Sequence, residues 1–261
     1  MYKWDAEDYK NSSSAQHEWA IELISKLELK GNERLLDIGC GDGKITAQIA
    51  LQLAEGSVLG IDSSEDMINL AKETFNSKKY PNLNFILKDA QELDFMEEFD
   101  VIFSNAALHW VKDHSSLLIH IRDSLKPSGK ILLQMGGKGN AESILKIADK
   151  MINDRKWKKY FEEFEFPYGF YSTEEYGEWL QKAGFNTILA QLIPKDMEKR
   201  DESEMAGWVR TTWLPYTQRV PKELQKEFIE ELIERYLKKY PKDDNGHIHV
   251  KMVRLEVEAT K

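Results

Sequence analysis

The sequence is poor in cysteine and in positive charge. It contains one cysteine, Cys40, so no disulfide bond can form within the chain. Lysine and arginine together number 36 against 45 aspartates and glutamates, which gives a formal net charge of −9. Proteins that bind nucleic acid generally carry a basic surface, so this balance argues against nucleic acid as a partner. Scarce cysteine is typical of a reducing compartment, and we expect the protein in the cytoplasm.

Long hydrophobic runs are absent as well. No uncharged apolar run approaches the roughly 20 residues that cross a bilayer, and the polar residues 1–5 lack the apolar core of a secretion signal. The apolar content of 41% nevertheless supports a substantial core. A length of 261 residues suits one large domain, with room for a sizeable insertion. We therefore expect a single domain over residues 1–261 that does not enter a membrane.

A short apolar run that leads into alternating glycines is the most informative motif. Residues 35–38 are followed by Gly39, Gly41 and Gly43, and about twenty residues later a second apolar run ends at Asp62. Glycine lets the backbone turn sharply and approach a ligand that a side chain would push away. An acid at the end of the next strand can accept both hydroxyls of a ribose. The pattern predicts a site for a nucleoside cofactor.

The spacing of the glycines discriminates between cofactors. The dinucleotide fingerprint Gly-x-Gly-x-x-Gly would place its third glycine at the position of Lys44. Here the third glycine is Gly43, one residue earlier. This favours S-adenosylmethionine, which has no pyrophosphate to seat on a helix N-terminus. An NAD-dependent oxidoreductase is the alternative.

Strand and helix patterns alternate through the first half of the chain. This predicts a parallel sheet with helices on both faces, with strands at residues 34–38, 57–62, 84–87, 99–105 and 130–135. Residues 141–184 read as mostly helical, and further strands are expected at residues 187–193 and 249–260. Residues 197–246 are too long for a plain loop and combine a helical pattern with many aromatics. We predict a helical cap there.

Several ordered motifs carry a family resemblance: residues 36–43, 60–68, 104–111, 125–129, 207–209 and 243–246. Together they resemble the class I S-adenosylmethionine-dependent methyltransferases, and more narrowly the trans-aconitate methyltransferases and their juvenile hormone acid methyltransferase relatives. The resemblance implies an α/β fold, a Rossmann-like seven-stranded sheet that is mostly parallel with its last strand antiparallel. It also implies a cofactor site at the carboxyl ends of the first four strands. An N-terminal segment, about residues 1–29, would cover the cofactor.

By position, the resemblance assigns the cofactor to residues around the glycine turn. Asp37 would lie beneath the methionine part, Asp62 would hold the ribose, and Asp89 would meet the adenine edge. Cys40 is interpreted as a small buried residue of the turn and not as a nucleophile, because no histidine adjoins it in the sequence. The predicted cofactor-binding residues are Gln16, Asp37, Gly39, Cys40, Gly41, Gly43, Asp62, Ser63, Met67, Asp89, Ala90, Asn105 and Ala106.

The substrate site is predicted from the residues that follow the fourth strand. His109 and Trp110 lie where a substrate would meet the sulfonium, and His109 is the one candidate base. A carboxylate is ionised near pH 7 and requires no base, so we favour O-methylation of a small carboxylic acid, either trans-aconitate-like or more apolar. Arginine binds carboxylates in a bidentate way. Arg210 is the predicted anchor, with Arg219 and Arg254 as further candidates.

Other functions stay open at this point. A hydroxyl, amine or carbon nucleophile is possible, and so is a scaffold that binds the cofactor without turnover. His247 and His249 alternate on the last predicted strand, but no cysteine joins them, so we predict a solvated edge and no metal site. The expected partner is a small-molecule substrate, and we expect a monomer or a dimer.

Overall fold

The computed structural model describes the backbone from Ser14 to Lys261 and the side chains from Trp19 onward. The side chain of Gln16 and residues 1–13 of the predicted covering segment therefore lie outside the described residues. The described chain forms two compact units. The sheet unit comprises residues 14–138, 168–193 and 254–261, and the helical unit comprises residues 139–167 and 194–253.

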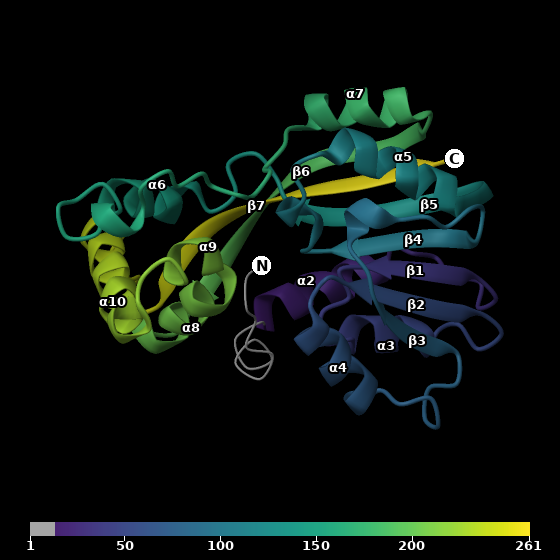
Figure 1. Ribbon diagram of the computed structural model, residues 1–261, viewed down its shortest axis with the longest axis horizontal. Coiled ribbons are helices and arrows are strands. Elements are labelled where there is room, and N and C mark those ends of the chain that lie inside the picture. Colours follow the sequence, from purple (N-terminus) through teal and green to yellow (C-terminus); the bar gives the residue numbers. More distant parts are fainter. Residues whose placement is uncertain (1–13) are drawn as a thin grey trace. The chain divides into compact units, whose positions relative to one another are not determined.

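The strands form one seven-stranded sheet in the order β3-β2-β1-β4-β5-β7-β6 (Figure 1). Neighbours from β3 to β5 pair in parallel, and β7 pairs antiparallel with β5. The predicted Rossmann-like, mostly parallel sheet with an antiparallel last strand is confirmed. The strands are β1 (Arg34–Ile38), β2 (Ser57–Asp62), β3 (Leu83–Leu87), β4 (Phe99–Asn105), β5 (Leu125–Gly136), β6 (Asn186–Lys199) and β7 (Ile248–Thr260).

Helices of the sheet unit cover both faces of the sheet. Because side chains alternate along a strand, Leu36 and Leu133 face the core under α5 and α7, whereas Leu35 and Leu132 face the core under α2, α3 and α4. Strands buried on both faces need the continuous apolar runs that this sequence shows. The elements are α2 (Ser14–Ile24), α3 (Lys44–Ala50), α4 (Glu65–Thr74), α5 (His114–Ser124), α7 (Thr173–Ala183) and the short 3-10 helices η1 (Ala90–Glu92) and η2 (Leu108–Trp110).

Local signals fix where several of these helices begin and end. The Ser64 hydroxyl accepts the Met67 N–H and so caps the start of α4. At the start of α7, Ser172 and Glu175 form a reciprocal capping box. Gly184 ends α7 with a φ of 83°, a left-handed cap that suits glycine.

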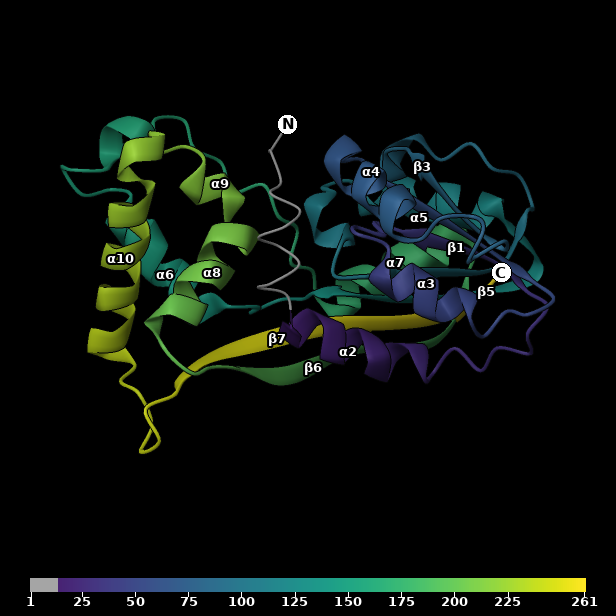
Figure 2. The same ribbon diagram turned by 90° about the horizontal axis from the view of Figure 1, so that it is seen from below.

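The helical unit packs around aromatic side chains. Trp157 and Phe161 both contact Phe228, with ring centroids 5.0 and 5.7 Å apart, and the Tyr216 hydroxyl donates to Asp149 at 2.7 Å. Its helices lie together in both views (Figure 1 and Figure 2). They are α6 (Glu142–Met151), η3 (Lys158–Tyr160), α8 (Glu202–Thr212), α9 (Leu214–Thr217) and α10 (Lys222–Lys239). Among the described residues, no helix is long and apolar enough to cross a membrane.

The structure differs from the sequence-based expectation in three segments. The sixth strand, expected over residues 187–193, extends as β6 to Lys199 and so includes the first residues of the predicted cap. Residues 161–172, expected to be helical, contain no helix; Pro167 lacks the N–H that a helix interior needs, and the aromatic side chains are used for packing instead. The fifth strand begins at Leu125 instead of residue 130. Residues 126–129 form a register shift in the pairing of β5 with β4, and Ser128 there has a φ of 65°.

Candidate functional site

The glycine turn after β1 has one side closed and one side open. The N–H groups of Gly39 and Cys40 donate to the Ile61 carbonyl at 2.8 and 2.9 Å, which ties the turn to β2. Gly39 has a φ of 75°, and a Cβ there would stand 2.1 Å from the Cβ of Ala107. Gly41 also has a positive φ, 53°, but a Cβ there would meet nothing within 4 Å. The backbone at Gly41 therefore faces open space, as a ligand cradle requires.

Asp62 fixes the shape of this turn. One carboxylate oxygen accepts the Gly41 N–H at 2.9 Å, and the other accepts the Ser64 N–H at 2.8 Å. Burial raises the pKa of Asp62, and these backbone hydrogen bonds oppose that shift. A carboxylate oxygen has two lone-pair sites, so the side chain can still accept hydrogen bonds from ligand hydroxyls. Asp62 thus combines a structural role with the chemistry of a ribose site.

Asp37 is a buried carboxyl group beneath the turn. It is 2% exposed and accepts a hydrogen bond from the Thr46 hydroxyl at 2.7 Å. Burial raises its pKa to about 7, against the opposing effect of Thr46. The same burial, together with the charge of Asp37, raises the pKa of the Cys40 thiol. A thiol that stays protonated is a poor nucleophile, which agrees with the sequence interpretation of Cys40.

The residues predicted to meet the adenine edge lie at the end of β3 and in the loop that follows it. The Lys88 N–H donates to the Asp62 carbonyl at 3.0 Å, which holds the end of β3 against β2. Asp89 follows directly and caps η1 by accepting the Gln91 N–H at 2.8 Å. Ala90 is half-buried, Ser63 is exposed and Met67 is buried.

Polar side chains interrupt the apolar pattern on one face of the sheet at the carboxyl ends of β4 and β5. Asn105 pairs in register with Gln134, and Gln134 pairs with Glu256 of β7. The Gln134 amide donates to Glu256 at 3.0 Å, and Lys26 donates to the same carboxylate at 2.7 Å. The side-chain oxygens of Asn105 and Gln134 are buried without a hydrogen-bond partner in the described structure. This row of polar groups adjoins the glycine turn and offers two acceptors to a ligand.

The segment after β4 is strained and leads into an aromatic group. Ala106 has a φ of 56°, and its N–H donates to the Gln134 carbonyl at 2.7 Å. Strained residues of this kind are concentrated at ligand and active sites. The next residues form η2, in which the Trp110 ring lies 4.4 Å from the ring of Tyr168.

His109 is 8% exposed, and its Nδ1 atom has no hydrogen-bond partner among the described residues. Its ring contacts Tyr168 at 5.2 Å and Phe170 at 6.0 Å, and its carbonyl accepts the Gly169 N–H. Burial, then the charges of Arg254 and His114, lower its pKa to about 3. The imidazole is therefore neutral at pH 7 and a weak base.

Tyr168 and Phe170 are site residues that sequence reasoning missed. They belong to a stretch in which every second residue is aromatic from Phe164 to Phe170. That alternation was the available signal, but the expectation of a helix over residues 141–184 concealed it.

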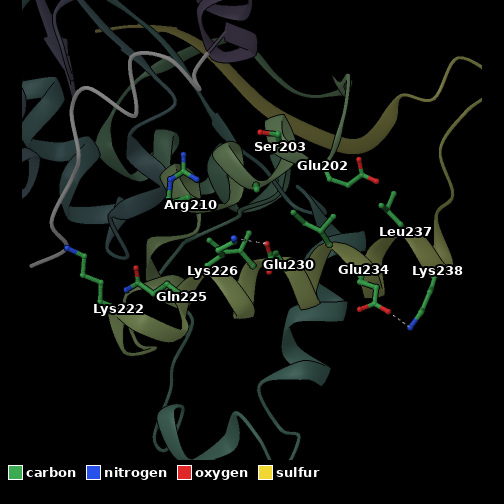
Figure 3. Close-up of a pocket in the computed structure, with 13 residues that line it drawn as sticks. Glu202, Ser203, Arg210, Lys222, Gln225, Lys226, Glu230, Glu234, Leu237 and Lys238 are labelled. Carbon is green, nitrogen blue, oxygen red and sulfur yellow. Dashed lines mark ion pairs between the residues drawn. The ribbon is translucent and has the colours of Figure 1, made fainter.

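Arg210 belongs to the helical unit, whereas the other described site residues belong to the sheet unit. It is exposed on α8 and lines a groove of about 1010 Å³ between α8 and α10 (Figure 3). Acidic side chains such as Glu202 and Glu230 share that groove. Arg219 donates to the Glu162 carbonyl at 3.0 Å, at the surface of the same unit.

His247 and His249 bind carboxylates near the start of β7. The Nδ1 atoms of His247 and His249 lie 2.6 Å from Glu198 and Asp196, respectively. In the described part of the chain, no group of three or more histidine, cysteine or acidic residues could hold a metal ion.

The glycine turn yields a matched pair of variants. Gly39→Ala should lower the free energy of unfolding by well over the roughly 1–2 kcal/mol of left-handed strain alone, because the new Cβ collides with Ala107. Gly41→Ala should lower the free energy of unfolding only by that left-handed strain, since its Cβ would meet no atom within 4 Å. Urea unfolding followed by tryptophan fluorescence measures both, and equal losses would contradict the closed and open sides assigned here.

The pKa of Asp37 predicts a pH-dependent stability. The folded-state pKa of about 7 lies above the ordinary value of 3.8, so the contribution of this group is fully present below pH 4 and lost as the pH rises through 7. Between pH 5 and 7, the free energy of unfolding should fall by up to about 1.4 kcal/mol per pH unit more than in Asp37→Asn. Parallel curves for the two proteins, measured in urea, would refute a raised pKa.

Comparisons with known proteins agree with this site. A family model described as a methyltransferase domain matches residues 29–184. An uncharacterized methyltransferase of Schizosaccharomyces pombe is 31% identical over 198 residues, 74% of each chain. Trans-aconitate 2-methyltransferase of Escherichia coli is 26% identical, over 100% of this chain and 99% of that one.

A solved structure shares the fold at lower identity. It is phosphoethanolamine N-methyltransferase 2 of Haemonchus contortus, in complex with phosphomonomethylethanolamine and S-adenosylhomocysteine. It superposes with a TM-score of 0.62 at 21% identity, over 98% of this chain and 56% of that one. With the family model covering more than half of the sequence, the chain belongs to the methyltransferase-domain family and is a class I S-adenosylmethionine-dependent methyltransferase.

Proposed function

We propose that the protein methylates the carboxylate of a small carboxylic acid. The observation that carries this proposal is the burial of His109, the one base that the sequence suggested, against the rings of Tyr168 and Phe170. With a pKa of about 3, its imidazole cannot hold a proton taken from a hydroxyl or amine near pH 7. A carboxylate needs no such base, because it is already ionised. The full-length similarity to trans-aconitate 2-methyltransferase supports the same substrate class.

The residues around the glycine turn fit S-adenosylmethionine. The open side of Gly41 admits a ligand against the backbone, and the remaining lone pairs of Asp62 suit ribose hydroxyls. The buried Asn105 oxygen suits the ammonium group of the methionine part. Asp37 lies beneath the turn, and a cation bound nearby would favour the charged form of its carboxyl group. We assign the remaining predicted contacts, Gln16 included, to the same cofactor.

When bound, S-adenosylmethionine would supply a methyl group on a positively charged sulfur. Transfer to a carboxylate oxygen forms a C–O bond and breaks the C–S bond, and the electron pair of the C–S bond goes to sulfur. No proton is released. The protein has to hold the acid in line and exclude water. Trp110, Tyr168 and Phe170 supply apolar surface for this beside His109. Such walls favour an acid with an apolar or unsaturated body over a tricarboxylate.

The other sequence predictions remain part of the proposal. We propose that the helices within residues 197–246 cover the bound substrate. The candidates for the carboxylate anchor are those named from the sequence, Arg210 first and then Arg219 and Arg254. A cytoplasmic location, a monomer or dimer, and the absence of a nucleic-acid partner stay predictions as well.

Transfer of radiolabelled methyl groups tests the proposed reaction. The panel contains trans-aconitate, trans-cinnamate and hexanoate, with the matching alcohols and amines. We expect label only on acids, released by mild base as a methyl ester should be, at a rate that is flat above about pH 6 because the acid is fully ionised there. Base-stable label on an alcohol or amine would contradict carboxylate methylation.

A substitution at His109 separates a hydrogen-bonding role from base catalysis. His109→Gln preserves polarity and approximate size, so kcat should fall less than roughly 10-fold and the pH–rate profile should keep its shape. Loss of a general base typically costs roughly 10²- to 10⁴-fold. A decrease of that size, with a changed pH profile, would restore His109 as the base. Trp110→Phe is the matched control for disturbance of η2.

A further inference from the structure

β7 brings a buried arginine to the carboxyl ends of the parallel strands. Arg254 is 4% exposed and pairs in register with Gly136 of β5. Along the strands, that pair lies two residues beyond the row of Asn105, Gln134 and Glu256. It is displaced toward the edge at which open α/β sheets bind their ligands. The alternation of side chains along β7 puts Arg254 on the same face as Glu256. Its guanidinium therefore belongs to the polar side of the cofactor site.

Trp19 of α2 lies against this guanidinium. The Arg254 Cζ atom lies 4.4 Å from the centroid of the indole ring. A guanidinium carries its N–H donors in a planar fork that matches the two oxygens of a carboxylate, and contact with an aromatic ring is favourable for its charge.

The positive charge of Arg254 extends to the group of rings around η2. Its positive charge acts on His109, where it helps to keep the imidazole neutral. The acid of the same strand face, Glu256, has its own cation in Lys26 at 2.7 Å. An acid bound between Arg254 and the rings near η2 would thus meet one fixed positive charge and a neutral imidazole.

We propose that Arg254 binds the substrate carboxylate and thereby selects acids over alcohols and amines. This rests on the proposed function, and it places the anchor in the sheet unit instead of at Arg210. A single guanidinium beside aromatic rings fits one carboxylate on an apolar body. A purely structural role is the competing account, in which Arg254 only holds α2 through Trp19.

Steady-state kinetics with trans-cinnamate, or with the best acid of the panel above, distinguish the two roles. Arg254→Gln should raise the KM for the acid roughly 10- to 100-fold, the usual effect of losing a charge-assisted bidentate contact. Arg254→Lys keeps the charge, so its KM for the acid should lie between the values of the wild-type protein and Arg254→Gln. The Kd for S-adenosylhomocysteine should change less than about twofold, because the substitution removes a contact to the acid and none to the cofactor. Arg210→Lys tests the rival anchor in the helical unit, and Lys26→Gln removes the ion pair with Glu256 while leaving Arg254 in place.

Each outcome decides between the accounts. A raised KM for the acid in the Arg254 variants, with Arg210→Lys and Lys26→Gln close to wild type, supports the assignment. An unchanged KM in both Arg254 variants overturns it, and so does a parallel loss of S-adenosylhomocysteine affinity that Lys26→Gln reproduces. If Arg254→Gln does not fold, Arg254→Lys gives the same comparison. Failure of the wild-type protein to methylate any acid would instead contradict the proposed function.

Discussion

The alternation of side chains along parallel strands is the constraint on which this site depends. One face of β1, β4 and β5 is apolar along the sheet and becomes polar toward the carboxyl ends of these strands, where Asp37 and Gln134 are buried and Glu256 of the antiparallel strand β7 is buried beside Gln134. Buried polar groups are costly unless they are bonded. Thr46 of α3 donates to Asp37, and Lys26, in the turn after α2, donates to Glu256. The helices on this face are thus tied to the polar row that they cover.

The chemistry follows from the charge states that burial imposes. Asp37 has a pKa near neutrality, and His109 is held neutral. Arg254 stays charged, because a guanidinium does not lose its proton in proteins. The site therefore offers a fixed cation and hydrogen-bonding groups but a weak base, a combination suited to an anionic nucleophile. Asp62 keeps the glycine turn beside these groups in place through two backbone N–H bonds.

The sequence predicted the parts of this arrangement that depend on short stretches of chain. Three glycines and Asp62 follow two apolar runs at fixed spacing, so the turn and its acid could be recognised locally. The sequence could not place Tyr168 and Phe170 beside η2, because this contact joins residues about sixty positions apart and depends on the tertiary structure. Arg254 could be named from the sequence only as one of three candidate anchors, because the register of β7 against β5 decides its level in the sheet. The helical unit also recruits residues 139–167, which no local pattern joined to residues 197–246.

A crystal structure with S-adenosylhomocysteine and trans-cinnamate would test the central claim most directly. The account predicts ribose hydroxyls on Asp62, the homocysteine ammonium at the Asn105 oxygen and the cinnamate carboxylate on Arg254. An acid seated instead in the groove between α8 and α10, on Arg210, would contradict the claim that the sheet itself supplies the substrate's anchor.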